Sequence, residues 1–229
     1  MMEFLERVRE VANRSKNASS HALTEEATKT SVVMPFLKML GFDVFDLNEV
    51  IPEFIADVGI KKGEKIDFAV KIDGKITILV EVKPITLPLG QAQYSQLFRY
   101  FATMKDVRLA ILTNGREVWF FSDVDAANRL DTAPFFTFDL QSFDTSAVAE
   151  LARFQKDGFS IGAIVEAASK LKFVDATANY IRQQMTSPSD DFARLVGRNI
   201  YEGSITKTVL EEMKAAVSAG MEQVIRDHI

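Results

Sequence analysis

Three charged residues, Asp67, Glu81 and Lys83, have side chains that could bind a divalent cation and activate a water molecule. They lie in residues 65–83, where apolar and charged positions alternate. Alternation with a period of two predicts two β-strands, and an Asp-Gly pair between them predicts the turn of a hairpin. One face of this hairpin is apolar and the other carries the charges. Two carboxylates that are close together on one face can bind a single ion.

The loop of the hairpin decides which residues of the two strands face each other. A two-residue Asp-Gly turn would set even-numbered positions against odd-numbered ones and place each apolar face beside the charged face of its partner. A three-residue loop over residues 72–74, with Gly74 in the left-handed position of a G1 bulge, brings the apolar faces together. We therefore predict the three-residue loop, which puts Asp67 opposite Leu79 and diagonal to Glu81.

The alternative interpretation of these charges is the solvated face of an edge hairpin. Glu81 and Lys83, however, come at the end of an apolar run that has the composition of a buried strand, and Pro84 follows it. Acidic side chains at the end of a buried strand are costly unless they are paired or bound to a metal. The position therefore favours a functional role.

The order of these residues resembles the signature of the PD-(D/E)XK nuclease superfamily, with Ile66 at the position of the Pro in that name. Residues from about Thr24 to Leu140 more closely resemble the N-terminal nuclease domain of type I restriction enzyme R subunits, and the stand-alone bacterial and prophage proteins that carry it. The segments that match, in order, are TEEATKTSVVMPFLKMLGFDVF, VIPEF, GEKIDFAV, ILVEVK, SQLFRYF and AILTNGREVWFF.

The resemblance implies a metal site on the hairpin. Asp67 and Glu81 would bind Mg²⁺, for which Mn²⁺ could substitute, together with a backbone carbonyl that we assign to Val82. Lys83 would orient or help to activate the attacking water and offset charge on the phosphate. A bound Mg²⁺ lowers the pKa of its water and polarises a phosphoryl oxygen.

The resemblance also implies a metal-facing acid on the first core helix, and we assign this role to Glu26. Glu26 has the helical phase of the stripe that must face the sheet, whereas Glu25 shares a side with Lys29 and has less need of burial. The stripe contains Thr30, Val33 and Leu37. The alternative role of Glu26 is to stabilise the positive end of the helix dipole.

Two further groups could flank the site. Gln96 and Tyr100 match the QxxxY element of RecB-like and type I restriction nucleases, in which it would position the lysine or the scissile strand, although this spacing alone is weakly specific. Lys61, Lys62 and Lys65 come from a basic turn before the hairpin and could hold a phosphate backbone.

Composition excludes several other kinds of site. The chain of 229 residues has no cysteine, which rules out disulfides, thiol catalysis and Cys-based zinc sites. Its two histidines, His21 and His228, are far apart in the sequence, so neither a His-based metal site nor a Ser/His/Asp triad is expected. The net charge of −5 weighs against tight nucleic-acid binding. The N-terminal residues predict neither a signal peptide nor a membrane span, so we expect a cytoplasmic protein.

The chain is expected to have an α/β fold with an all-helical C-terminal appendage. Residues 1–140 would form a restriction-endonuclease-like core, in which a central mixed sheet is flanked by helices. From residue 145 onward helical periodicity takes over, and residues 141–229 would form the appendage. The expected helices of the core span about 2–16, 24–40 and 89–104, and its further strands 42–54, 107–113, 117–122 and 135–140.

Taken with the resemblance, these features predict a Mg²⁺-dependent endonuclease that cuts DNA and acts in restriction or phage defence. The alternative is a non-catalytic nuclease-fold module that binds nucleic acid or a partner protein. Besides DNA, the partners would be a second copy of the chain or the subunits of a restriction–modification system.

Overall fold

The computed structural model describes residues 2–22, 24–55, 65–90, 92 and 94–228. The chain divides into two compact units, Met1–Leu171 and Lys172–Ile229. Residues 141–171 pack with the sheet of the first unit, because Leu151, Phe154 and Ile164 belong to its hydrophobic core. None of the helices among the described residues is long and apolar enough to cross a membrane.

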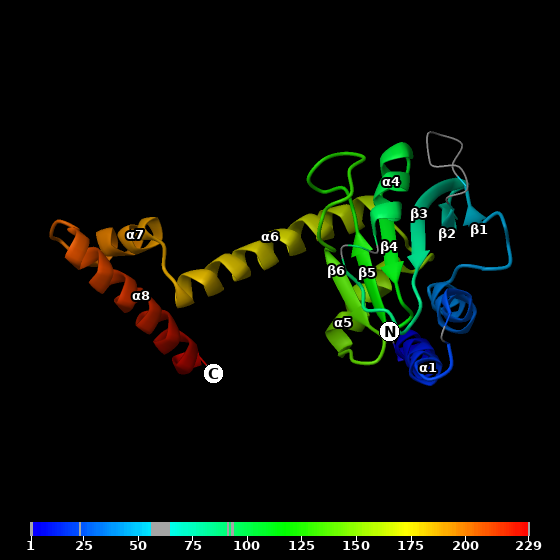
Figure 1. The fold of residues 1–229 in the computed structure, drawn as a ribbon, viewed down its shortest axis with the longest axis horizontal. Helices are drawn as coiled ribbons and strands as arrows, with labels where there is room; N and C mark the ends of the chain where they lie inside the picture. Colours follow the sequence, from blue (N-terminus) through cyan, green and yellow to red (C-terminus); the bar gives the residue numbers. More distant parts are fainter. Residues whose placement is uncertain (1, 23, 56–64, 91, 93, 229) are drawn as a thin grey trace. The chain divides into compact units, whose positions relative to one another are not determined.

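Among the described residues, the first unit contains a mixed β-sheet of six strands that lie side by side in sequence order (Figure 1). In this described sheet β3 and β4 run parallel, and the other neighbouring strands are antiparallel. This confirms the predicted α/β class with a central mixed sheet. The strands are β1 (Val50–Phe54), β2 (Ile66–Ile72), β3 (Lys75–Val82), β4 (Leu109–Thr113), β5 (Glu117–Phe121) and β6 (Phe136–Asp139).

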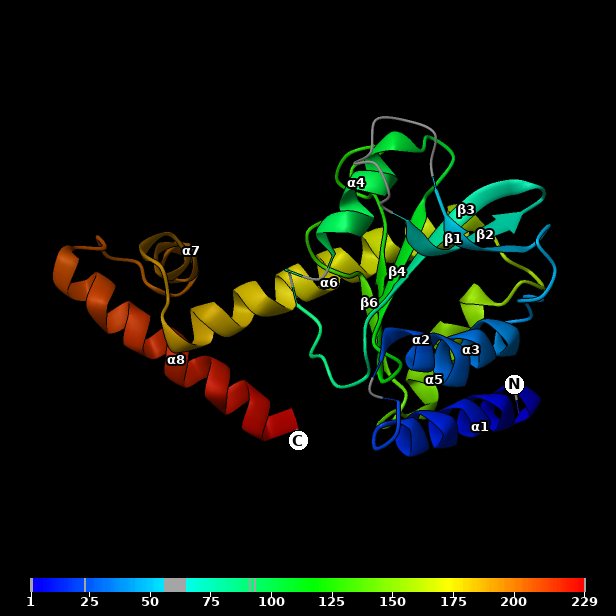
Figure 2. The ribbon, with the colours of Figure 1, turned by 45° about the vertical axis from the view of Figure 1, so that its right-hand side comes forward.

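Helices cover both faces of the sheet and bury one hydrophobic cluster on each. On one face, Phe68, Val80 and Ile111 pack with α1, with the segment from α2 to α3, and with α5 and the start of α6. On the other face, Leu79 and Leu112 pack with α4. Figure 2 shows α1 alongside the segment from α2 to α3. The helices are α1 (Met2–Ala18), α2 (Glu25–Thr28), η1 (Lys29–Val33), α3 (Met34–Met39), α4 (Ser95–Thr103), α5 (Thr145–Leu151), η3 (Ala152–Phe154) and α6 (Ile161–Thr186).

The first core helix contains one π-helical segment, η1, between α2 and α3. Pro35 lies at the start of α3, where it cannot donate the backbone hydrogen bond of a continuous α-helix. The wider turn changes the phase of the helix. As a result Thr28 and Lys29 are buried, whereas Glu26 and Thr30 are exposed, and the stripe predicted through Glu26 and Thr30 is wrong.

The hairpin of β2 and β3 corrects the predicted loop. Asp73 and Gly74 have φ angles of 50° and 76°, which is the two-residue type I′ turn that we had rejected, and Ile72 pairs with Lys75. The register then shifts between Val70 and Lys71, because Thr77 is an extra residue on β3. This bulge restores the match between apolar faces.

The shifted register also changes the neighbours of Asp67. Ala69 pairs with Leu79, and Phe68 pairs with Val80. One further step along the same register places Asp67 directly opposite Glu81. The predicted pairing of Asp67 with Leu79 is therefore wrong, and the two carboxylates are closer neighbours than the diagonal arrangement would make them.

Gly115, in the turn between β4 and β5, is a site at which we expect a large effect on stability. It has a φ of +79°, and a Cβ atom there would lie 2.8 Å from Cγ2 of Thr28. Gly74 has a similar φ of +76° with nothing within 4 Å. Gly74→Ala should cost only the left-handed strain of about 1–2 kcal/mol, and Gly115→Ala should cost roughly 1–3 kcal/mol more because of the overpacking. Denaturant unfolding of both variants measures the difference, and equal losses would contradict the clash.

The second unit contains the end of α6 and two further helices, α7 (Asp190–Ile200) and α8 (Lys207–His228). Ser189 caps α7 by accepting a hydrogen bond from the Phe192 N–H. Ala193, Leu210 and Met213 form the small buried cluster between α7 and α8. This confirms the expected helical C-terminal region.

Candidate active site

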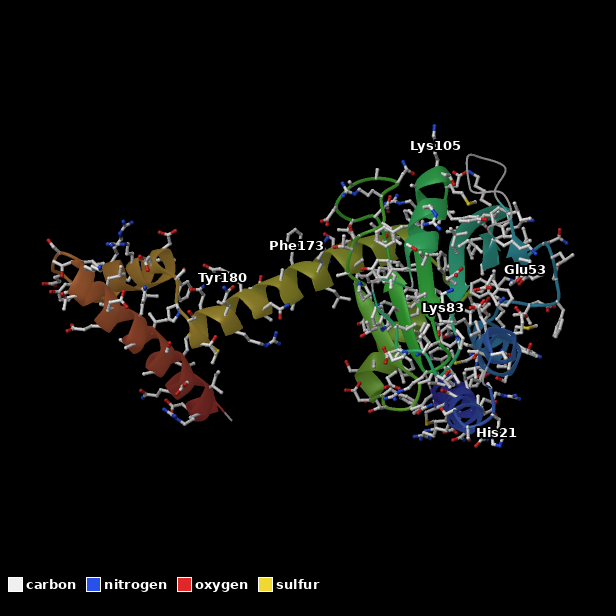
Figure 3. The ribbon with its side chains drawn as sticks, in the orientation of Figure 1. His21, Glu53, Lys83, Lys105, Phe173 and Tyr180 are labelled. Atoms are coloured by element: carbon white, nitrogen blue, oxygen red, sulfur yellow. The ribbon has the colours of Figure 1, made fainter. Side chains whose placement is uncertain are left out.

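Three acidic residues lie at the same level on three adjacent strands. Pro52 pairs with Phe68 and Phe54 with Ile66, so Glu53 on β1 faces Asp67 on β2. Asp67 in turn faces Glu81 on β3. The last two are buried, with 6% and 2% of their surface exposed. Figure 3 labels Glu53 of this group and Lys83, the residue that follows β3.

The Asp67 carboxylate is fixed by two interactions. Its Oδ2 accepts a hydrogen bond of 2.6 Å from the Val82 backbone N–H, which ties it to the end of β3. Its Oδ1 pairs with the ammonium group of Lys29. The carboxylate is therefore oriented before any ligand binds.

Lys29, on the first turn of η1, is the centre of an ion-pair network. Its Nζ lies 2.6 Å from Oε1 of Glu26, 3.2 Å from Oε1 of Glu53 and 3.7 Å from Oε1 of Glu25, besides its contact with Asp67. Burial lowers the pKa of this ammonium group, but the hydrogen bonds to Asp67 and Glu26 outweigh that effect and raise it. Lys29 therefore carries a positive charge among four carboxylates.

Lys83 forms a second ion pair beside the first. Its Nζ lies 2.5 Å from Oε1 of Glu81 and 3.7 Å from Oε2 of Glu25. Glu25 thus lies between the two lysines. The Oε2 atom of Glu81 is buried and has no hydrogen-bond partner in the described part of the chain.

The environment of the buried acids opposes their ionisation. Burial raises the pKa of Glu81 to about 7, and the charge of Asp67 adds to the rise, although the hydrogen bond from Lys83 opposes it. Burial also raises the pKa of Asp67 against the opposing effects of Lys29 and the Val82 N–H. Groups with such perturbed pKa values are concentrated at functional sites.

The raised pKa of Glu81 predicts a pH dependence of stability. In the unfolded chain this group releases its proton near its ordinary pKa of 4.5, but in the folded protein it keeps the proton up to about pH 7. The folded state therefore binds more protons over this range, and stability falls as the pH rises through it. The loss by pH 8 should be on the order of 3 kcal/mol.

The measurement is urea unfolding from pH 4.5 to 8 in EDTA, with Glu81→Gln beside the wild type. Gln cannot titrate, so the difference between the two curves isolates this group. Glu3→Gln, at an exposed position on α1, is the control and should run parallel to the wild type. If the stability of Glu81→Gln changes with pH in parallel with that of the wild type, Glu81 is not the cause of the pH dependence.

The chemistry of these residues fits a hard divalent cation. Asp67 and Glu81 supply only oxygen ligands, and the unpartnered Oε2 of Glu81 is an acceptor that a cation would satisfy. Among the residues that the structure describes, no three acidic or histidine side chains are close enough to hold an ion by themselves. Mg²⁺ usually takes one or two carboxylates and keeps several waters, so two carboxylates meet its demand.

The other candidate residues from the sequence differ in their burial and in their partners. The Glu26 side chain is 76% exposed and pairs with Lys29. Tyr100 is fully buried in the cluster between the sheet and α4. Lys65 pairs with Glu53 at 3.0 Å. Gln96 is on α4, but its side chain lies outside the described residues, as do Lys61 and Lys62.

Sequence reasoning missed three members of the network, Glu25, Lys29 and Glu53. The spacing of Glu25 and Lys29 showed that they share a helix side, but the change of phase at η1 is what turns that side toward the strands. Glu53 has a φ of +50°, which is unusual for a residue with a side chain. Hydrogen bonds from Lys65 and Lys29 hold it there and lower the pKa of its carboxyl group.

Part of the chain is similar to a known protein family. Residues 24–134 match the model of the family described as type I restriction enzyme R protein N terminus (HSDR_N). Neither a curated protein nor a solved structure matches the chain significantly. The matched segment includes the residues of the ion-pair network, from Glu25 on α2 to Lys83 after β3. Residues 24–134 are therefore assigned to the type I restriction enzyme R protein N-terminal family, in agreement with the motifs of the sequence.

Proposed function

We propose that the chain is a Mg²⁺-dependent endonuclease of the PD-(D/E)XK type that hydrolyses phosphodiester bonds in DNA. The observation that carries the proposal is the pair of buried carboxylates, Asp67 and Glu81, beside the ammonium group of Lys83, with one oxygen of Glu81 unpartnered. The family assignment supports a role in restriction. A nuclease of this kind could act with partner subunits of a restriction–modification system or as a homo-oligomer.

In this proposal Asp67 and Glu81 hold the metal, with the Val82 carbonyl as a third ligand. When bound, the ion would lower the pKa of a water molecule and stabilise charge on the phosphate. The Val82 N–H keeps Asp67 in position. Lys83 orients the attacking water and stabilises negative charge on the phosphate as it develops.

Two acids on the first core helix are candidates for contacting the metal ion. Glu26 remains our prediction from the sequence, as an acid that reaches the ion directly or through water. Glu25 is a second candidate, because it is less exposed and lies within 3.7 Å of both Lys29 and Lys83. A cleavage assay of Glu25→Gln and Glu26→Gln distinguishes these two residues. Only the substitution of the residue that faces the ion should lower the rate of DNA cleavage. Gln96 and Tyr100 would position Lys83 or the scissile strand.

The test is cleavage of supercoiled, linear and single-stranded DNA with Mg²⁺ or Mn²⁺. We expect metal-dependent cleavage that EDTA abolishes and that Asp67→Asn and Glu81→Gln abolish. Cleavage at the wild-type rate in either variant would refute the proposed site.

One observation favours the alternative, a nuclease-fold module that binds without cutting. Lys29 already pairs with Asp67, so the charges of the site are partly balanced without a metal. Titration calorimetry with Mg²⁺ distinguishes the two functions. Metal binding that Asp67→Asn removes supports the enzyme, whereas no binding and no cleavage support the module.

A further inference from the structure

A groove of about 630 Å³ lies between α1 and α3, within the first unit. Arg7 and Arg14 of α1 line it, together with Lys38 of α3 and Phe45. Its only described carboxylate is that of Glu10. The groove therefore combines three positive charges with an aromatic ring, in a chain whose net charge is −5.

The cations of this groove are not neutralised by the described residues. Arg7, Arg14 and Lys38 form no ion pair with any described carboxylate, in contrast to Arg9, which pairs with Glu6. The Nε atom of Arg7 is buried and has no hydrogen-bond partner in the described part of the chain. A buried donor without a partner costs free energy, and an anion in the groove would satisfy it.

The aromatic residue of the groove is unusually exposed. Phe45 has 78% of its surface accessible, although it lies among apolar side chains such as Met34 and Val44 that line the same groove. An exposed aromatic ring beside cations is the combination that binds single-stranded nucleic acids, because the ring stacks on a base and the cations contact the backbone. In a duplex the bases are already stacked and paired.

The groove and the candidate active site lie on two sides of one helical segment. Thr30 lines the groove, whereas the preceding residue, Lys29, pairs with Asp67. The Thr30 hydroxyl donates to the backbone carbonyl of Glu26, and the side-chain Oε1 of Glu26 accepts a hydrogen bond from Lys29. A strand bound at the active site could therefore pass over this segment and reach the groove.

We propose that the groove between α1 and α3 binds a single-stranded segment of the nucleic-acid substrate. Arg7, Arg14 and Lys38 contact its phosphates, and Phe45 stacks on one of its bases. This inference rests on the proposed function, because it assigns the groove to the strand that continues beyond the cleaved bond.

The test measures binding in EDTA, so that cleavage plays no part. Fluorescence anisotropy follows a labelled single strand and the corresponding duplex over a range of salt concentrations. The groove variant carries Arg7→Gln, Arg14→Gln and Lys38→Gln. The control variant makes the same change of charge at exposed positions elsewhere, with Lys75→Gln, Lys105→Gln and Arg129→Gln.

We expect the groove variant to bind the single strand at least tenfold more weakly and to reduce the slope of log K against log salt by about 2, since each neutralised phosphate of a single strand contributes roughly 0.7. The control should change affinity less than twofold. Phe45→Ser should weaken single-strand binding by about tenfold and duplex binding much less. Equal losses in the groove and control variants would overturn the inference.

Three further outcomes are decisive. Displacement of the strand by a small excess of mononucleotide would assign the groove to free nucleotides and overturn the strand assignment. If the wild type does not cleave DNA but the groove variant loses single-strand binding, the groove assignment is supported and the proposed nuclease function is refuted. If the wild type cleaves DNA and the groove variant binds the single strand as well as the wild type does, the nuclease function is supported and the groove assignment is refuted.

Discussion

Replacing Lys83 with methionine should lower the rate of DNA cleavage by about 10²–10³-fold, the loss typical for removing one group that stabilises transition-state charge. Lys83 Nζ lies 2.5 Å from Oε1 of Glu81, so in the proposed site it is next to the metal and the attacking water. Methionine keeps most of the volume of the side chain but removes the charge. The measurement is single-turnover cleavage of supercoiled DNA with saturating Mg²⁺.

The fold should survive this change. The buried Glu81 carboxyl group, whose pKa is already raised to about 7, can take up a proton when its partner is lost, so no uncompensated charge has to remain. Thermal unfolding checks this point. Lys75→Met, at an exposed position at the start of β3, is the matched control and should cleave at the wild-type rate. A Lys83→Met variant that cleaves as fast as this control would rule out the proposed role of Lys83.

Lys29→Met should destabilise the metal-free protein by about 3–5 kcal/mol, and Mg²⁺ should restore part of the loss. Lys29 is buried and pairs with Asp67, Glu26 and Glu53, so its removal leaves several carboxylates close together without a cation. Asp67 is the most buried of these three acids, and its repulsion with Glu81 would increase. A divalent ion at the same carboxylates would replace the missing charge.

The experiment compares melting temperatures in EDTA and in millimolar Mg²⁺. Mg²⁺ should raise the melting temperature of Lys29→Met by several degrees more than that of the wild type. Lys105→Met, at an exposed position after α4, controls for the substitution itself and should match the wild type in both buffers. If Mg²⁺ fails to stabilise Lys29→Met, the carboxylates around Lys29 do not bind the metal in the proposed way. This readout is independent of cleavage.

Local patterns in the sequence predicted most of the elements. The alternation in residues 65–83 gave both strands of the hairpin, and the helical periodicity after residue 145 gave α5 to α8. The motifs between about Thr24 and Leu140 indicated the family whose model then matched residues 24–134. These features depend on neighbours a few residues apart, so the sequence shows them directly.

The register of the hairpin was beyond the reach of local patterns. The sequence correctly required that the apolar faces of β2 and β3 meet, but it did not show that an extra residue, Thr77, achieves this. We placed the irregularity in the loop, and it lies in the strand. Either position satisfies the burial of the apolar face, so the choice depends on packing over the whole sheet.

The sequence by itself determined that Asp67, Glu81 and Lys83 share one face of a hairpin. This shared face made the three residues candidates for an active site. Only the tertiary structure decided what surrounds them. The π-helical turn of η1 brings Lys29 and Glu25 to this face, and the pairing of β1 with β2 brings Glu53. These residues come from separate elements, and their charges meet only because the helix and the strands pack together over long sequence distances. Such convergence leaves no periodic signal in the chain, because each residue belongs to the pattern of its own element.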